Sequence, residues 1–205
     1  MKKFRISQKW FNCSLLCGML CAIFLSLSSF NTACDDLRGN VLRLHIIANS
    51  NSESDQQLKL KIRDSILAES ENLFSHSESV EDAVSVAENS LAEIEKIANR
   101  VIKENNFNYK ATAAVKQSYF ETREYDDFTL PAGDYESLVI NLGKSEGKNW
   151  WCVIFPEICL PSASGAKLSD TVNQNSADIA ESKDRYIMKF KIVEIYEDFK
   201  KSLTK

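Results

Sequence analysis

The order of hydrophobic patterns along the chain predicts an α+β fold in a single domain. We expect a mainly antiparallel sheet of about four to five strands, with two long helices and a C-terminal helix on one face. Apolar and polar residues alternate in residues 41–48 and 135–142, as they do in strands. Between these segments, residues 55–74 and 80–104 follow the 3.6-residue period of amphipathic helices. The length of 205 residues suits one domain, or at most two small ones.

Residues 1–33 have the three parts of an export signal. Basic residues open the segment and acidic residues are absent from it, an apolar stretch follows from about residue 15 to residue 30, and small and polar residues close it. The apolar stretch is long for a signal peptide and shorter than a clean membrane span of about 20 residues. A cleaved signal peptide and an uncleaved N-terminal anchor therefore both remain open, as does lipid attachment at Cys34. We expect residues 34–205 to form the domain.

Residues 41–48 form the first predicted strand. Alternate apolar residues from Leu42 to Ile46 point to one face, and Arg43 and His45 point to the other. The polar residues 49–52 end the strand, because their side chains compete for nearby backbone groups, and they can cap the helix that follows.

The helix predicted over residues 55–74 has two apolar stripes with Lys59 and Arg63 between them. A cation inside an apolar arc either extends its charged end into solvent, pairs with a buried carboxylate, or belongs to a contact surface. The second helix, residues 80–104, has one apolar stripe and a charged, solvated face. Ser79 caps its start, and the Asn105-Asn106 pair ends it.

Further strands are predicted after the second helix. Residues 109–119 form one strand, which residues 120–128 continue or pair with as a hairpin. Residues 135–142 and 150–155 form two more strands, joined by a flexible hairpin loop that contains two glycines.

The C-terminal part of the chain is less regular in sequence. Residues 162–183 consist mostly of small and polar residues, so we expect a mobile loop there. Alternation in residues 188–192 and a helical stripe in residues 192–203 predict a short strand that enters a C-terminal helix.

Composition and spacing argue against several classes of protein. The net charge of −4 argues against nucleic-acid binding, which usually requires a basic surface. The two histidines, His45 and His76, and the cysteines after residue 33 lack metal-ligand spacing. The sequence also lacks a phosphate-binding glycine loop and a G-x-S-x-G motif. We therefore expect no metal and no cofactor.

Cys152 has two further interpretations. As a nucleophile with His45 as its base, it would make the chain a secreted thiol-dependent hydrolase. However, a thiol inside an apolar strand is usually an inert small side chain. Alternatively, Cys152 pairs with Cys159 across Pro156 in a disulfide bond, which an exported protein can form. Two separate buried thiols remain the other possibility.

Trp150 and Trp151 lie next to each other in the last predicted strand. Alternation sends the two side chains to opposite faces of the sheet. Both are buried only if both faces are covered. Otherwise one of them is exposed, and an exposed tryptophan can anchor a partner.

Two stretches carry a resemblance to a known family. Residues 42–64 read LRLHIIANSNSESDQQLKLKIRD, and residues 130–159 read LPAGDYESLVINLGKSEGKNWWCVIFPEIC. The first is similar to an arginine–any residue–histidine signature followed by Ala-Asn-Ser, and the second to a Gly-Lys-Asn-Trp-Trp-Cys-Val block. In both, the chain resembles the stage II sporulation protein R family of endospore-forming bacteria. It departs from the family pattern at Glu157, where a second proline is usual, and within residues 162–183.

The resemblance implies a secreted signalling protein, which the forespore exports into the space between the forespore and mother-cell membranes. Such proteins activate a membrane-bound aspartic peptidase that processes the sigma-E precursor. The chain would bind the extracytoplasmic face of this peptidase as a protein ligand without catalytic residues, and only its N-terminal segment would contact the membrane. We expect the contacts on the first strand and its turn, the next helix and the loop before the last strand: Arg43, His45, Asn49, Ser50, Lys61, Arg63, Asp64, Lys148, Asn149, Trp150 and Trp151.

Overall fold

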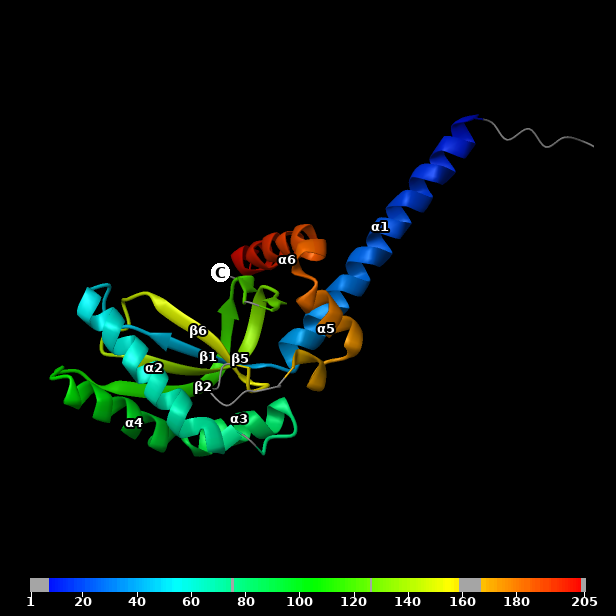
Figure 1. Cartoon of the computed structure of the whole chain (residues 1–205). Helices are drawn as coiled ribbons and strands as arrows, with labels where there is room; N and C mark the ends of the chain where they lie inside the picture. The colour runs from blue at the N-terminus through cyan, green and yellow to red at the C-terminus, as the bar shows by residue number, and fades with distance from the viewer. Residues whose placement is uncertain (1–7, 75, 126, 159–166, 204–205) are drawn as a thin grey trace, which may run out of the picture.

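A four-stranded mixed sheet forms the centre of the computed structural model, which describes residues 8–74, 76–125, 127–158 and 167–203 (Figure 1). The strands lie in the order β2 (Ala111–Phe120), β5 (Gly133–Leu142), β1 (Leu42–Ile47) and β6 (Asn149–Phe155). β1 and β5 are parallel, and the other two neighbouring pairs are antiparallel. This confirms the predicted α+β class.

Three helices cover one face of this sheet, which we call the helical face: α2 (Glu53–Phe74), α3 (Val80–Asn89) and α4 (Leu91–Glu104) (Figure 1). Their apolar stripes pack on the alternate strand residues that the sequence predicted, among them Leu44, Ile46 and Ile140. The single helix expected over residues 80–104 is divided at Ser90. The backbone N–H of Ser90 closes α3, and its carbonyl accepts the first hydrogen bond of α4.

Among the described residues, the segments that cover the opposite face of the sheet lie near the start of β1. There the end of helix α1 (Gln8–Gly39), the short helices η1 (Leu168–Asp170) and α5 (Gln174–Glu181), and the small sheet of β3 (Arg123–Glu124) and β4 (Thr129–Leu130) form a second core. Leu37, Phe120, Tyr135 and Leu168 are among its buried side chains. In the described residues β3 and β4 pair with each other and not with β2, so beyond Phe120 residues 120–128 neither continue the preceding strand nor pair with it as a hairpin.

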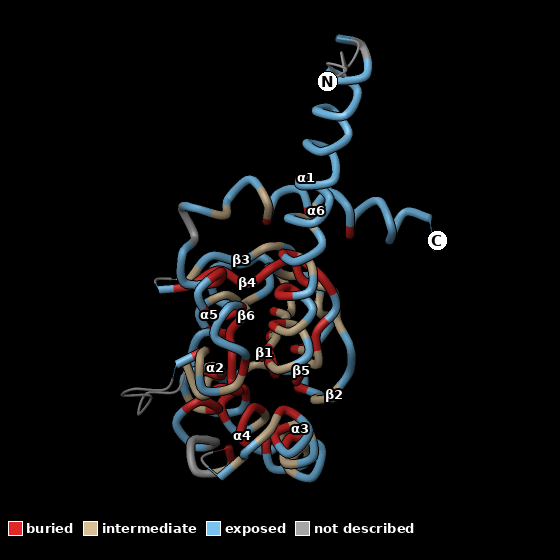
Figure 2. The backbone as a smooth tube through the Cα atoms, turned by 90° about the vertical axis from the view of Figure 1, so that its right-hand side faces the viewer, coloured by how far each residue is buried: buried red, intermediate tan, exposed pale blue. Residues whose placement is uncertain are grey.

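Helix α1 runs without a break from the N-terminal apolar segment into the domain. Its first part is almost entirely exposed and is long and apolar enough to cross a membrane, a property that signal sequences share. From Phe30 onward the helix becomes buried, and Phe30, Ala33 and Cys34 pack in a third core (Figure 2). The predicted domain boundary at residue 33 therefore falls inside a packed helix, and cleavage there stays a prediction.

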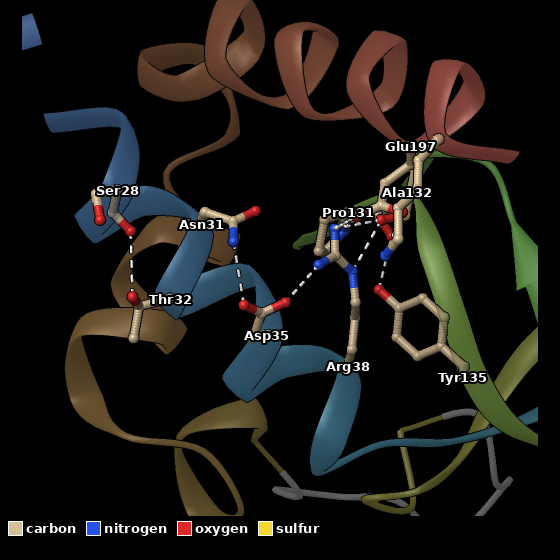
Figure 3. Close-up of polar contacts among 10 residues, drawn as sticks. Ser28, Asn31, Thr32, Asp35, Arg38, Pro131, Ala132, Tyr135 and Glu197 are labelled. Atoms are coloured by element: carbon tan, nitrogen blue, oxygen red, sulfur yellow. Dashed lines mark hydrogen bonds and ion pairs between the residues drawn. The ribbon is translucent and has the colours of Figure 1, made fainter. Parts of the chain in front are cut away.

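The end of α1 is also held by polar contacts (Figure 3). The Arg38 guanidinium donates from Nε and Nη2 to the carbonyl oxygen of Ala132, at 2.9 and 2.6 Å, and forms an ion pair with Asp35 at 2.7 Å. Its Nη2 also lies 3.7 Å from Oε1 of Glu197 in the C-terminal helix. These contacts fix α1 against the turn before β5 and against the C-terminal helix.

Three predictions for the C-terminal part are wrong. Residues 174–181, expected in a mobile loop, form α5, whose small side chains Ala177 and Ala180 allow it to pack closely on the second core; residues 162–166 lie outside the described residues. The strand expected at residues 188–192 is instead part of α6 (Lys183–Leu203). Although α6 was predicted on the face that carries the two long helices, it packs on α1 and α5.

Candidate partner-binding surface

The turn between β1 and α2 carries the Asn-Ser pair of the first signature, and both side chains donate hydrogen bonds to Asp55. Asn49 Nδ2 donates to Asp55 Oδ2 at 2.9 Å, and the Ser50 hydroxyl donates to the same oxygen. Tyr109 Oη donates to the other oxygen, Oδ1, at 2.7 Å. Because Asp55 is only 5% exposed, these donors replace the water that a carboxylate would otherwise bind. We call these four residues the Asp55 network.

Hydrogen bonding sets the charge state of this network. Burial alone would raise the pKa of the Asp55 carboxyl, but the hydrogen bonds from Ser50, Tyr109 and Asn49 outweigh it and hold the pKa below the ordinary value. Burial and the hydrogen bond to Asp55 raise the pKa of Tyr109. At neutral pH the network therefore contains a carboxylate and a neutral phenol.

The same turn is joined to the loop between β5 and β6. This loop was expected to close a hairpin, but it crosses the end of β1, because β1 lies between β5 and β6 in the sheet. Asn49 Oδ1 accepts the backbone N–H of Lys144 at 3.0 Å, and Asn51 Oδ1 accepts that of Lys148 at 2.8 Å. The backbone N–H of Gly147 donates to the carbonyl oxygen of Ala48 at 2.9 Å. Asn49 thus connects two segments about 95 residues apart in the chain and stabilises the fold. Its contact with a partner, like that of Ser50, stays a prediction.

Lys59 takes part in the same connection. Its side chain is buried, and Nζ donates to Gln56 Oε1 at 2.8 Å and to the carbonyl oxygen of Lys148 at 3.0 Å. Burial lowers the pKa of Lys59, and the nearby cations of Arg63 and Lys148 act in the same direction. The hydrogen bonds of this cation to neutral oxygens were not among the alternatives that the sequence offered.

Arg43, predicted to contact the partner, lies entirely inside the second core. Its Cζ is 3.9 Å from the ring centroid of Phe120 and 4.8 Å from that of Tyr135, and Nη2 donates to Tyr125 Oη at 2.8 Å. Stacking of a guanidinium on aromatic faces stabilises its charge where water is excluded. Because the side chain is fully buried, we remove Arg43 from the predicted contact surface.

His45 lies farther along the same strand face, where the covering segments end. It is directly opposite Trp151 in the register of β1 and β6, and their ring centroids are 5.8 Å apart. Burial lowers the pKa of His45; a hydrogen bond with Asn149 opposes this shift, and the cations of Lys116 and Arg43 add to it. His45 is therefore neutral at pH 7.

A group of partly or fully exposed side chains surrounds His45 on this side of the sheet, while α1 and α5 lie toward the other end (Figure 1). The pairing of β1, β2, β5 and β6 places them on one face. Among the described residues, His45 Nε2 and Trp151 Nε1 have no hydrogen-bond partner. We call this group the open face; it consists of His45, Ile47, Lys116, Asn141, Asn149 and Trp151.

The predicted residues of α2 lie on the other side of the sheet. Trp150 packs against the core between the sheet and helices α2–α4, and the Arg63 guanidinium lies 5.0 Å from the centroid of the Trp150 ring. Arg63 also forms an ion pair with the exposed Asp64 at 2.6 Å, and Lys61 Nζ donates to Asn105 Oδ1 at 2.6 Å. Trp150 and Trp151 are each half-buried. The structure therefore lies between the two alternatives, which were burial of both side chains and exposure of one.

The register of β6 argues against the thiol-hydrolase interpretation. Cys152 lies opposite Leu44 and faces α2–α4, whereas His45 lies opposite Trp151 on the open face. A nucleophile and its base on opposite faces of one sheet cannot exchange a proton. Cys152 is buried and disulfide-bonded. Cys159 lies outside the described residues, so their pairing stays a prediction.

Five members of these two groups were not among the residues expected to contact the partner: Ile47, Asp55, Tyr109, Lys116 and Asn141. Nothing in the local pattern shows that Tyr109, which follows α4, reaches the start of α2. Within the part of the chain that the structure describes, no group of histidine, cysteine and acidic side chains could hold a metal ion.

The molecule is thus an α+β domain that follows an N-terminal helix long and apolar enough to cross a membrane, and its described residues present an aromatic and polar face of the sheet. A family model described as stage II sporulation protein R matches residues 38–165, and the chain belongs to this family. It is 34% identical to stage II sporulation protein R of Bacillus subtilis (strain 168) over 157 residues, which cover 77% of this chain and 66% of that relative. No solved structure matches the chain.

Proposed function

We propose that this protein is the forespore's signal to the mother cell during sporulation. It is exported into the space between the two membranes, where it activates the membrane-bound aspartic peptidase that processes the sigma-E precursor. It acts there as a protein ligand without catalysis of its own. The observation that carries this proposal is membership of the stage II sporulation protein R family, because the matched residues include all four strands of the central sheet.

The contact with the peptidase is assigned to the open face. Activation requires that the ligand bind the active state of the peptidase more tightly than the inactive one, so the surface must form specific contacts. Half-buried aromatic rings bordered by polar groups are typical of such contacts, since they bury much area at little cost in side-chain entropy. His45, Asn149 and Trp151 combine these properties on one rigid sheet.

The role is tested by co-expressing the peptidase, the sigma-E precursor and this chain, with precursor cleavage as the readout. The full chain should support cleavage. A chain without residues 1–25 should not, because it lacks the exposed apolar part of α1 and stays in the cytoplasm, although it retains Phe30, Ala33 and Cys34. Fusion of an unrelated signal peptide to residues 26–205 should restore cleavage. Undiminished cleavage with a product that is never exported would contradict the proposal.

The surface is tested in the same assay. His45→Ala and Asn149→Ala should each lower precursor cleavage severalfold without loss of folded protein, and Lys96→Ala, an exposed position on α4, is the matched control. Asn49→Ala should instead lower the amount of folded protein, because Asn49 connects two loops. Normal activation by both His45→Ala and Asn149→Ala would show that the partner binds elsewhere.

A further inference from the structure

Helix α6 is apolar on two opposite sides. Tyr186, Phe190 and Val193 pack on α1 and α5, as in any helix that covers a core. About 140° around the helix axis, a second set of large apolar side chains follows the spacing of a single stripe. We call this set the outer stripe; it consists of Met188, Ile192, Ile195, Tyr196, Phe199 and Leu203, and all six residues are exposed.

The outer stripe is too apolar for an ordinary solvated face. Ile195 is 60% exposed, Phe199 62% and Met188 74%. Single exposed apolar residues are common, but a continuous stripe over four turns indicates a surface that another apolar phase covers. Lys189 and Lys200 border the stripe by helical spacing. Bordering lysines can keep their charge in water while their alkyl stems lie on an apolar surface.

Polar and aromatic contacts fix the orientation of α6. Its inner side is held by Phe30, whose ring centroid lies 5.1 Å from that of Phe190. Tyr119 Oη donates to Asp198 Oδ1 at 2.7 Å, and Lys201 Nζ lies 4.0 Å from the Tyr119 ring centroid. Because these contacts hold this side of α6 against the domain, the outer stripe points away from the domain.

The position of α6 along α1 indicates what covers the stripe. Lys189 Nζ donates to Ser26 Oγ at 2.9 Å, and the α1 residues before Ser26 have exposed apolar side chains from Trp10 to Leu25. This exposed part is about 24 Å long at 1.5 Å per residue, which is most of the roughly 30 Å thickness of a bilayer's hydrocarbon core. Both views show α6 at the level where α1 leaves the domain. The sheet lies below α6, on the side away from the exposed part of α1 (Figures 1 and 2).

We propose that α6 is a membrane-interfacial helix, whose outer stripe lies among the headgroups and first acyl carbons of the bilayer that α1 enters. An amphipathic helix with bordering lysines binds such an interface, most strongly where the lipids are anionic. The stripe and the exposed part of α1 then form one continuous lipid-facing surface. The proposal does not depend on peptidase activation.

The depth of α6 can be measured in the full chain. The exposed Cys13, Cys17 and Cys21 are replaced by serine, and a single cysteine carries an environment-sensitive fluorophore. The probe positions are Ile195→Cys and Phe199→Cys. Lys191→Cys, on a charged flank of the same helix, and Lys96→Cys, on α4, are the controls. The protein is placed in vesicles of equal parts phosphatidylcholine and phosphatidylglycerol, with and without nitroxide-labelled lipid.

The nitroxide lipid should quench the probes at residues 195 and 199 at least about threefold more than those at the control positions, and these two probes should be shielded from aqueous iodide. Equally weak lipid quenching at all four positions, with full access for iodide, would overturn the proposal. Shielding from iodide without lipid quenching would also overturn it, because protein, such as a second copy, would then cover the stripe.

A second measurement guards against a general effect of labelling. With the fluorophore at Met188→Cys, the pair Ile195→Glu and Phe199→Glu should remove most of the lipid quenching while the helical circular dichroism stays unchanged. These substitutions lie on the outer stripe, so folding does not require the native side chains. Retained quenching in this variant would contradict an interfacial α6.

Discussion

At the scale of residues, the first of the two stretches that carry the resemblance contains three separate environments. Asn49 and Ser50 donate to Asp55 and so hold a turn in place, whereas His45 lies on the open face beside Trp151. Arg43, two residues before His45, lies inside the second core. Neighbouring residues of one stretch thus divide between the folded interior and the open face, because alternate strand residues and turn residues meet different surroundings.

We expect Asp55→Ala to lower the free energy of unfolding by about 2–4 kcal/mol, since it leaves three partly buried donors without their charged acceptor. Urea denaturation of the full chain in mild detergent, followed by tryptophan fluorescence, measures the change. Glu53→Ala is the control, because Glu53 is exposed in the same helical turn. An equal effect of the two substitutions would show that the Asp55 network contributes little.

His45 should make stability depend on pH. Its pKa in the folded protein is lowered below 6.5, mainly by burial, so the unfolded chain takes up a proton at a higher pH than the folded one. Its contribution is therefore complete above about pH 6.5 and decreases as the pH falls below that value. Between about pH 7.5 and pH 5.5, His45→Gln should lose less stability than the unchanged chain. Parallel losses in both proteins would contradict this assignment.

At the scale of elements, the loop between β5 and β6 depends on close backbone approach. A Cβ at Gly147 would meet the backbone carbonyl oxygen of Ser50 and would lie 2.8 Å from Cβ of Ala48. Glycine is therefore required where this loop crosses the turn after β1.

Gly147→Ala should separate these two loops and destabilise the protein by about 1–3 kcal/mol. It should also increase amide hydrogen exchange at Lys144 and Lys148, whose N–H groups donate to Asn49 and Asn51. Gly39→Ala is the matched control, because nothing lies within 4 Å of the added Cβ. Unchanged exchange in Gly147→Ala would mean that the loops adjust without separating.

Elements with strong periodicity were predictable, and elements defined by their neighbours were not. β1, α2 and β5 match their predicted ranges closely, since their apolar residues repeat at the period of the structure they form. α5 packs closely on the second core through small side chains and contains few large apolar residues. Its sequence therefore shows no apolar period that would predict a helix. The alternation at residues 188–192 arises because α6 is apolar on both sides, and two opposite helical stripes can imitate a strand.

At the scale of the whole molecule, α1 and the domain are one packed unit. Cleavage at residue 33 would remove Phe30 and Ala33 from the third core and leave Phe190 without its ring contact. Loss of a buried aromatic side chain typically costs about 3–5 kcal/mol. The packing therefore favours retention of α1 as an anchor.

We expect the protein isolated from sporulating cells to contain peptides that span residue 33 and to stay with the membrane in alkaline carbonate. Mass spectrometry of a C-terminally tagged chain measures both properties. The fusion of an unrelated signal peptide to residues 34–205 should yield less folded protein than the fusion to residues 26–205. A stable, soluble product that begins near residue 34 would contradict retention.

The sequence by itself determined the α+β class, the strands and long helices with clear periods, the apolar N-terminal segment and the family, since these depend on local pattern or on runs of identical residues. Only the tertiary structure decided which predicted residues share a surface. Strand register separates Cys152 from His45 and joins His45 with Trp151, and long-range packing buries Arg43 and exposes the outer stripe of α6. Such relations depend on contacts between residues far apart in the chain, and no local pattern encodes them.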